Sequence, residues 1–268
     1  MAEVITLWVV GLSAAIVFLS LVFAMARRLG RYDLIDTAWG MTFIVTSWTW
    51  AFLVPPVSGY SLLVYALLLG AVTLWGMRLS AHIGSRFAAS KAEDLRYVEL
   101  RKKWRSKHWS QMYMRIYMVQ ALLATIVVSP LLVGFWHVQQ TDSLHIGVLA
   151  WLAIAVWVKG FVWESIGDWQ LRRFIAQAKH KGTVMQTGLW RYSRHPNYFG
   201  ELTQWWGIGL FVYAVTCSMW AFIGPAVLSY LIIWVSGIPP AERQAARRTG
   251  WAEYKRCTSI LVPFPPRR

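Results

Sequence analysis

The densest group of chemically capable side chains lies in residues 188–201, whose sequence is GLWRYSRHPNYFGE. Pro196 suits the first position of a helix, because that position needs no backbone N–H. Such a helix begins with free N–H groups and the positive end of its dipole, and Arg191, Arg194 and His195 stand just before it. A helix N-terminus beside clustered cations is an anion site, and a phosphate group suits it well.

Polar side chains continue along this helix. Asn197 and Glu201 are four residues apart, so they share one face, and Tyr198 adds a hydroxyl and an aromatic ring beside them. A carboxylate that enters a membrane helix is costly and is a functional hypothesis by default. We therefore favour a ligand site over the alternative, a basic loop at the membrane edge that contacts lipid headgroups.

A second group precedes this run. Glu164, Asp168 and Arg172 follow one another at four-residue spacing, which places them on one helical face. One interpretation is that Asp168 and Arg172 hold the hydroxyl and phosphate groups of a nucleotide. The alternative is a ladder of structural ion pairs that closes the end of the helix.

A third group lies near the C-terminus. Arg243, Arg247 and Tyr254 are expected on one helical face, with Glu242 at its start. The alternative is a solvated amphipathic tail. The three groups are expected to share one side of the membrane, which favours a common site.

The elements that position these groups are long apolar runs. Apolar and aromatic residues make up 57% of the 268 residues, and charged residues only 15%, whereas soluble domains carry about 25% charged residues. A helix that spans a bilayer needs about 20 mostly apolar residues. Runs of about that length occupy residues 4–26, 34–54, 61–79, 113–133, 146–166, 199–215 and 219–237. The sequence thus predicts an all-α, polytopic membrane bundle of about seven transmembrane helices, forming one domain over residues 1–268.

The positive charges indicate the orientation. Lys and Arg cluster within residues 27–31, 78–115, 172–194 and 243–268, which are alternate connections, and the opposite connections contain neither residue. The positive-inside rule then places the N-terminus outside and the C-terminus in the cytoplasm. This orientation and anionic headgroups explain the net charge of +15, so we expect no nucleic-acid partner. The two cysteines show no metal-binding or disulfide spacing.

The chain resembles a known group of membrane enzymes. The residues that carry the resemblance are Asp33, Asp36, Trp39 and Gly40; Trp75, Gly76, Arg78 and Leu79; Glu93, Asp94, Arg96 and Tyr97; Glu164, Asp168, Gln170 and Leu171; residues 188–201; Trp205, Trp206 and Gly207; Ser236, Gly237, Ile238 and Pro239; and Glu242, Tyr254, Thr258, Pro263 and Phe264. Together they are similar to the steroid 5-alpha-reductase-like superfamily, and specifically to its bacterial branch of unknown function. The run 188–201 is specific for the superfamily but says less about the substrate.

The resemblance implies an NADPH-dependent reductase of a C=C bond, and the substrates expected from it are conjugated enones of a steroid-like or other lipophilic kind. Membrane lipids are expected partners, and no obligatory protein partner is expected. The expected location is the bacterial inner membrane. Carried over residue by residue, the dinucleotide site would comprise Asp168, Arg172, Arg194, His195, Asn197, Tyr198, Glu201 and Tyr254. No G-x-G-x-x-G motif follows a strand, so a Rossmann cofactor site is not expected.

The residues expected to bind the substrate differ from those of the animal steroid reductases. Those enzymes bind the substrate ketone with a Gln-Glu pair in the second helix and a Tyr in the third. This chain offers Asp36 in the second helix and Trp75 and Arg78 in the third. We interpret Asp36 as an acid or substrate anchor and assign Arg78 beside it as the second catalytic candidate. The alternative is that Asp36 caps its helix or pairs with Arg31 or Arg78.

Two other functions fit parts of the pattern. Isoprenylcysteine carboxyl methyltransferases share an Arg-His-Pro-x-Tyr run and bind S-adenosylmethionine at the equivalent place. Asn197, Glu201 and the pair of Asp168 and Arg172 match the reductase pattern better, and S-adenosylmethionine has no phosphates for the arginines to bind. A non-catalytic membrane protein that binds lipids is the third alternative.

Overall fold

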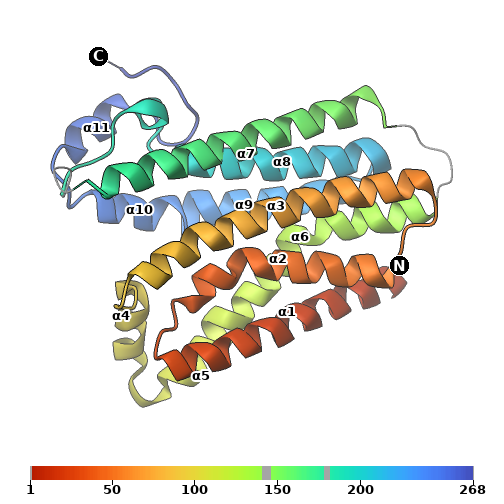
Figure 1. Cartoon of the computed structure of the whole chain (residues 1–268), viewed down its shortest axis with the longest axis horizontal. Helices are drawn as coiled ribbons and strands as arrows, with labels where there is room; N and C mark the ends of the chain where they lie inside the picture. The colour runs from red at the N-terminus through yellow and green to blue at the C-terminus, as the bar shows by residue number, and fades with distance from the viewer. Residues whose placement is uncertain (1, 141–145, 178–181, 268) are drawn as a thin grey trace. The chain divides into compact units, whose positions relative to one another are not determined.

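The computed structural model describes residues 2–140, 146–177 and 182–267 (Figure 1). These residues form helices joined by turns and links, with no β-strand among them beyond one isolated bridge between Thr183 and Thr249. The predicted all-α fold class is confirmed. The chain divides into two compact units: unit 1 comprises Met1–Ile146 and Val215–Ile223, and unit 2 comprises Gly147–Ala214 and Gly224–Arg268. The single domain over residues 1–268 stays a prediction.

Unit 1 contains α1 (Ala2–Leu29), α2 (Leu34–Leu53), α3 (Gly59–Ala89), α4 (Leu95–Trp104), α5 (His108–Met112) and α6 (Met118–Gln139). The helix α2 packs against α1, α3 and α6 (Figure 1). Trp50 of α2 is fully buried, and its indole N–H donates to the carbonyl of Leu7, 2.8 Å away. A side chain at Gly11 would overlap the Trp50 ring, so this glycine lets α1 approach α2.

Unit 2 contains α7 (Val148–Ile175), α8 (Pro196–Thr216), α9 (Ile223–Tyr230), α10 (Ile238–Ala245) and α11 (Trp251–Cys257). A π-helical turn, Leu231–Val235, joins α9 to α10. The expectation that Arg243, Arg247 and Tyr254 share one helical face is wrong, because the helix ends at Ala245 and a new one starts after Gly250. Gly250 has a φ of 81°, a left-handed conformation that glycine adopts without steric cost and that interrupts a helix.

Five helices in the described part of the chain are long and apolar enough to cross a membrane: Ala2–Leu29, Gly59–Ala89, His108–Gln139, Val148–Ile175 and Met219–Ala245. They indicate a multi-pass membrane protein. The predicted spans 34–54 and 199–215 correspond to α2 and α8, helices of 20 and 21 residues that are not among these five. Both are rich in Thr, Trp and other residues of low hydropathy.

Several helices extend beyond their apolar runs. The helix α3 continues to Ala89 and α7 to Ile175, whereas the apolar runs stop at residues 79 and 166. Hydropathy marks only the apolar part of a helix, while backbone hydrogen bonding continues through the polar residues that follow. Asp168 and Arg172 consequently lie on α7 itself and not in a connecting loop.

Candidate functional site at the start of helix α8

The helix α8 begins at Pro196, as the sequence predicts. A 3₁₀ turn, Gly188–Arg191, precedes it, and two contacts with α7 hold this turn in place. The Leu189 backbone N–H donates to Oε1 of Gln170 (2.9 Å), and the Trp190 indole N–H donates to the carbonyl of Gly167 (3.1 Å). The polar run therefore has a defined position on α7.

Four glycines allow α7 and α8 to lie in close contact. Gly160 and Gly167 of α7, and Gly200 and Gly207 of α8, each face the other helix so closely that a Cβ atom would touch its backbone. A Cβ on Gly200 would lie 2.5 Å from the backbone nitrogen of Glu164. The seven-residue spacing within each pair corresponds to about two helical turns, which places both glycines of a pair on one face.

Two acid–amide pairs cross this contact. Asn197 Nδ2 donates to Oδ1 of Asp168 (3.2 Å), and Gln204 Nε2 donates to Oε2 of Glu164. The carboxylates are almost fully buried, Glu164 being 2% and Asp168 7% exposed. The opposite ends of both amides, Asn197 Oδ1 and Gln204 Oε1, are buried without a hydrogen-bond partner among the described residues. Glu201, between the two amides on α8, is also buried.

Arg194 is buried, and its guanidinium binds groups within unit 2. Its Nε donates to Oε1 of Glu242 (2.7 Å), and its Nη1 donates to the carbonyls of Thr258 (2.6 Å) and Lys255 (3.1 Å). The Arg194 backbone N–H also donates to the carbonyl of Ser259. These bonds tie the segment before α8 to α10 and to the end of α11.

His195 is buried beside the same carboxylate. Its ring stacks on that of Tyr198, with centroids 5.4 Å apart and an interplanar angle of 15°. Its Nε2 lies 3.5 Å from Oε1 of Glu242, too far for a strong hydrogen bond. Burial lowers the pKa of His195 to about 4, an effect that the nearby Glu242 only partly offsets. The imidazole is therefore neutral near pH 7.

Tyr254 closes the other side of the 3₁₀ turn. It is 4% exposed, and its hydroxyl donates to the carbonyls of Trp190 (2.6 Å) and Ser193 (3.2 Å). Burial raises the pKa of Tyr254, so the phenol keeps its proton at neutral pH. The structure thus gives Tyr254 and Arg194 the role of holding the polar run in place.

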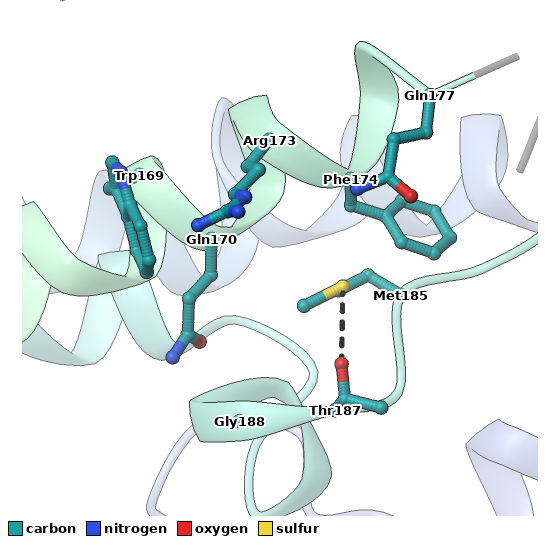
Figure 2. Close-up of a pocket in the computed structure, with 8 residues that line it drawn as sticks. All are labelled: Trp169, Gln170, Arg173, Phe174, Gln177, Met185, Thr187 and Gly188. Atoms are coloured by element: carbon teal, nitrogen blue, oxygen red, sulfur yellow. Dashed lines mark hydrogen bonds between the residues drawn. The ribbon is translucent and has the colours of Figure 1, made fainter.

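Three arginines near the end of α7 and the start of α8 differ from Arg194 in their exposure. Arg172, Arg173 and Arg191 are all exposed to solvent. Arg173 also lines a pocket of about 210 Å³ between the end of α7 and residues 185–188 (Figure 2). In the part of this region that the structure describes, these three arginines are accessible to a phosphate from solution.

The two residues expected on the substrate side lie in unit 1. Asp36, in the first turn of α2, accepts from the Tyr97 hydroxyl (2.6 Å) and from Arg96 Nη2 (2.7 Å). Arg31 pairs instead with Asp33 (2.9 Å), so the alternative of an Asp36–Arg31 pair does not hold for the described contacts of Asp36. Burial raises the pKa of Tyr97, and the adjacent Asp36 carboxylate raises it further. Asp36 therefore connects the start of α2 to Arg96 and Tyr97 of α4.

Arg78 lies half-buried on α3, which packs against α2. The two helices approach closely at Gly40 and Gly76, where a Cβ on Gly76 would lie 2.6 Å from the carbonyl oxygen of Gly40. Asp36 on α2 and Arg78 on α3 thus lie on two helices that pack together. Each residue is within about one helical turn of the glycine of its own helix at this contact.

Sequence reasoning missed Gln204, Gly160 and Gly167 as parts of this region, and it named Gly200 and Gly207 only within the resemblance. Gln204 is seven residues after Asn197 and so falls on the same face of α8. The glycine pairs at seven-residue spacing carried a similar signal. Both patterns become informative only once α7 is known to lie against α8.

The chain was compared with known proteins. A family of proteins of unknown function, DUF1295, matches residues 22–258. An uncharacterized protein of Schizosaccharomyces pombe, C594.04c, is 26% identical over an alignment that covers 52% of this chain and 45% of that protein. The alignment thus spans less than half of that relative's length. No solved structure matches the chain.

Proposed function

The chain belongs to the DUF1295 protein family, and we propose that it is a membrane-embedded reductase that uses NADPH to reduce a C=C bond of a lipophilic substrate. The residues of this chain that resemble the steroid 5-alpha-reductase-like superfamily motivate this assignment. They include the whole run 188–201, which contains the buried polar residues Ser193, Arg194, His195 and Glu201.

One observation carries the proposal: two buried amide oxygens on one face of α8 have no hydrogen-bond partner in the described residues. Asn197 Oδ1 lies near the start of the helix, and Gln204 Oε1 lies two turns further in. Each such acceptor costs about 1–3 kcal/mol while it is unsatisfied. A ligand with several N–H and O–H donors would satisfy them, and the ribose hydroxyls and carboxamide of a nicotinamide nucleotide are donors of this kind.

The residues present fit that nucleotide. Asp168, Asn197 and Glu201 provide acceptors for hydroxyl and amide groups, and Arg172 provides an exposed cation for phosphate. The stacked rings of His195 and Tyr198 add an aromatic surface. Arg194 and Tyr254 hold the segment on which these groups lie. Bound NADPH supplies the hydride for the reduction.

For the substrate side we propose Asp36 and Arg78. A guanidinium can donate hydrogen bonds to a carbonyl oxygen and so polarise a conjugated double bond. Asp36 accepts hydrogen bonds from the Tyr97 hydroxyl at Oδ1 and from Arg96 Nη2 at Oδ2, which orients both donors on α4.

The proposed membrane arrangement has seven spans, in which α2 and α8 cross the bilayer together with the five more apolar helices. The N-terminus lies outside and the C-terminus in the cytoplasm, and the membrane is the bacterial inner membrane. The alternation of basic and uncharged connections supports this arrangement. Membrane lipids and a lipophilic small molecule are the proposed partners.

Thermal unfolding of the purified protein in detergent tests the function. A ligand that binds only the folded state raises the melting temperature, so we expect NADPH to stabilise the protein more than NADH does. No shift with either nucleotide would rule out the reductase. A shift with S-adenosylmethionine alone would point to the methyltransferase instead.

A further inference from the structure

The pocket at the end of α7 has a composition that suits one part of a nucleotide. Its volume of about 210 Å³ is below the roughly 300–1,000 Å³ of pockets that enclose whole drug-sized ligands. It lies entirely within unit 2 and is bounded by the last turns of α7 and by residues 185–188 (Figure 2). A pocket of this size holds a ring system with one substituent.

Its walls are apolar and partly aromatic. Trp169 lies on one side, and Phe174 and Met185 lie on the other (Figure 2). Met185 is buried, whereas Trp169 is 49% exposed and leaves the pocket accessible from solvent. Aromatic faces and a thioether form a surface on which a flat base stacks well.

The polar groups of the pocket favour an anion. Arg173 lies with its guanidinium carbon 5.5 Å from the centroid of the Trp169 ring, and none of the described residues that line the pocket is acidic. An arginine that stacks on an aromatic ring presents the edge of its planar fork, which suits bidentate binding of phosphate. Gln170 is held by the Leu189 N–H at Oε1, so its NH₂ group is left as a hydrogen-bond donor.

We propose that this pocket binds the 2′-phosphoadenosine end of NADPH, with adenine against Phe174 and Met185 and the 2′-phosphate on the Arg173 guanidinium, which stacks on the Trp169 ring. This inference rests on the proposed function and adds to it a basis for preferring NADPH over NADH. The chain itself links the two sites: of the pocket residues, Thr187 immediately precedes the 3₁₀ turn before α8, and Gly188 is the first residue of that turn.

The decisive variants are Arg173→Gln and Trp169→Leu in the full-length protein in nanodiscs. Removal of the guanidinium should weaken NADPH binding about tenfold to a hundredfold and leave NADH affinity unchanged, because only NADPH carries the 2′-phosphate. Loss of the Trp169 ring, on which that guanidinium stacks, should weaken NADPH binding by about tenfold and leave NADH affinity unchanged. In the wild type, 2′,5′-ADP should compete with NADPH.

Two control variants match these changes. Arg256→Gln removes a guanidinium that is 72% exposed and paired with Glu253, and Trp151→Leu removes an exposed tryptophan at the other end of α7. Both should bind NADPH and NADH as the wild type does. Melting temperatures without nucleotide, if equal among all four variants, exclude misfolding as the cause of weaker binding.

The outcomes separate the two proposals. If the wild type binds neither nucleotide, the reductase proposal fails and this inference with it. If NADPH binds but Arg173→Gln leaves the preference over NADH intact, or 2′,5′-ADP does not compete, only the pocket assignment is overturned. It is likewise overturned if Arg173→Gln changes only the response to phosphatidylglycerol against phosphatidylcholine nanodiscs, because the pocket would then bind a lipid headgroup.

Discussion

The guanidinium Nε of Arg194 lies 2.7 Å from Oε1 of Glu242, although 48 positions separate the two residues in the chain. Arg194 is 7% exposed and Glu242 17%, so water screens their interaction only weakly. The contact joins the segment that introduces α8 to α10. This ion pair gives Arg194, which the sequence predicted as a ligand-binding cation, a structural role.

We expect Arg194→Gln to lower the free energy of unfolding by roughly 3 kcal/mol, because it leaves Glu242 and the Thr258 carbonyl without their buried partner. Arg194→Lys should restore only part of this loss, since an ammonium cannot reproduce the planar fork. Unfolding in detergent measures both, with the exposed Arg191→Gln as the control. Unchanged stability with weaker NADPH binding would instead make Arg194 a direct phosphate ligand.

The buried imidazole of His195 should make stability depend on pH. Its pKa is about 4 in the folded protein and about 6.5 in an unfolded chain. Between these values the unfolded state binds a proton that the folded state does not, so stability falls as the pH drops from about 6.5 to about 4 and is constant above about 7. The full effect is roughly 3 kcal/mol.

His195→Gln should remove this component of the pH dependence, measured as melting temperature from pH 8 to pH 4. His108→Gln, which removes a histidine of α5, is the matched control and should retain it. An identical acid response in the wild type and His195→Gln would contradict the prediction.

Gly200→Ala should destabilise the contact between α7 and α8. The added Cβ would lie 2.5 Å from the backbone nitrogen of Glu164, so the helices would have to separate. Overpacking of this kind costs about 1–3 kcal/mol. Gly70→Ala places the same methyl group on α3 where no atom lies within 4 Å, and it should be neutral or stabilising by up to about 1 kcal/mol. Equal melting temperatures for the two variants would show that α7 and α8 tolerate a wider separation.

Asn197→Ala and Glu201→Gln test the placement of the cofactor, because both change polar groups on the face of α8 that we assign to it. Loss of a hydrogen bond to the nucleotide should weaken NADPH binding about tenfold to a hundredfold. Thr203→Ala, whose hydroxyl bonds to the carbonyl of Phe199 in the same helix, should bind NADPH normally. Earlier melting of the ligand-free variants with undiminished NADPH affinity would mean that Asn197 and Glu201 only join α8 to its neighbours.

The proposed topology predicts opposite locations for the two chain ends. A reporter fused to the C-terminus should be active in the cytoplasm, and one fused to the N-terminus should be active outside. This follows from an odd number of spans with the basic connections inside. Reporters that are active on the same side would require an even number, and α2 or α8 would then be the first span to reconsider.

The long helices and the start of α8 could be predicted from the sequence because their signals are local. Apolar runs of membrane length indicated the long helices, and Pro196 marked the start of α8, since a proline at the first position lacks only an N–H that the helix does not use. Spacing alone also placed Asn197 and Glu201 on one face. Hydropathy could not locate the polar ends of α3 and α7, because those turns are helical without being apolar.

Partners of the charged side chains were decided only by the tertiary structure. Asp36 binds Arg96 and Tyr97, about 60 residues away, and not the Arg31 that lies nearby in the sequence. Tyr254 donates to carbonyls of the turn before α8, a contact that its own helix does not specify. Periodicity fixes the face of a helix on which a side chain lies, but its partner depends on which other helix packs there. Buried polar groups must be satisfied across that contact, so their roles follow from the packing.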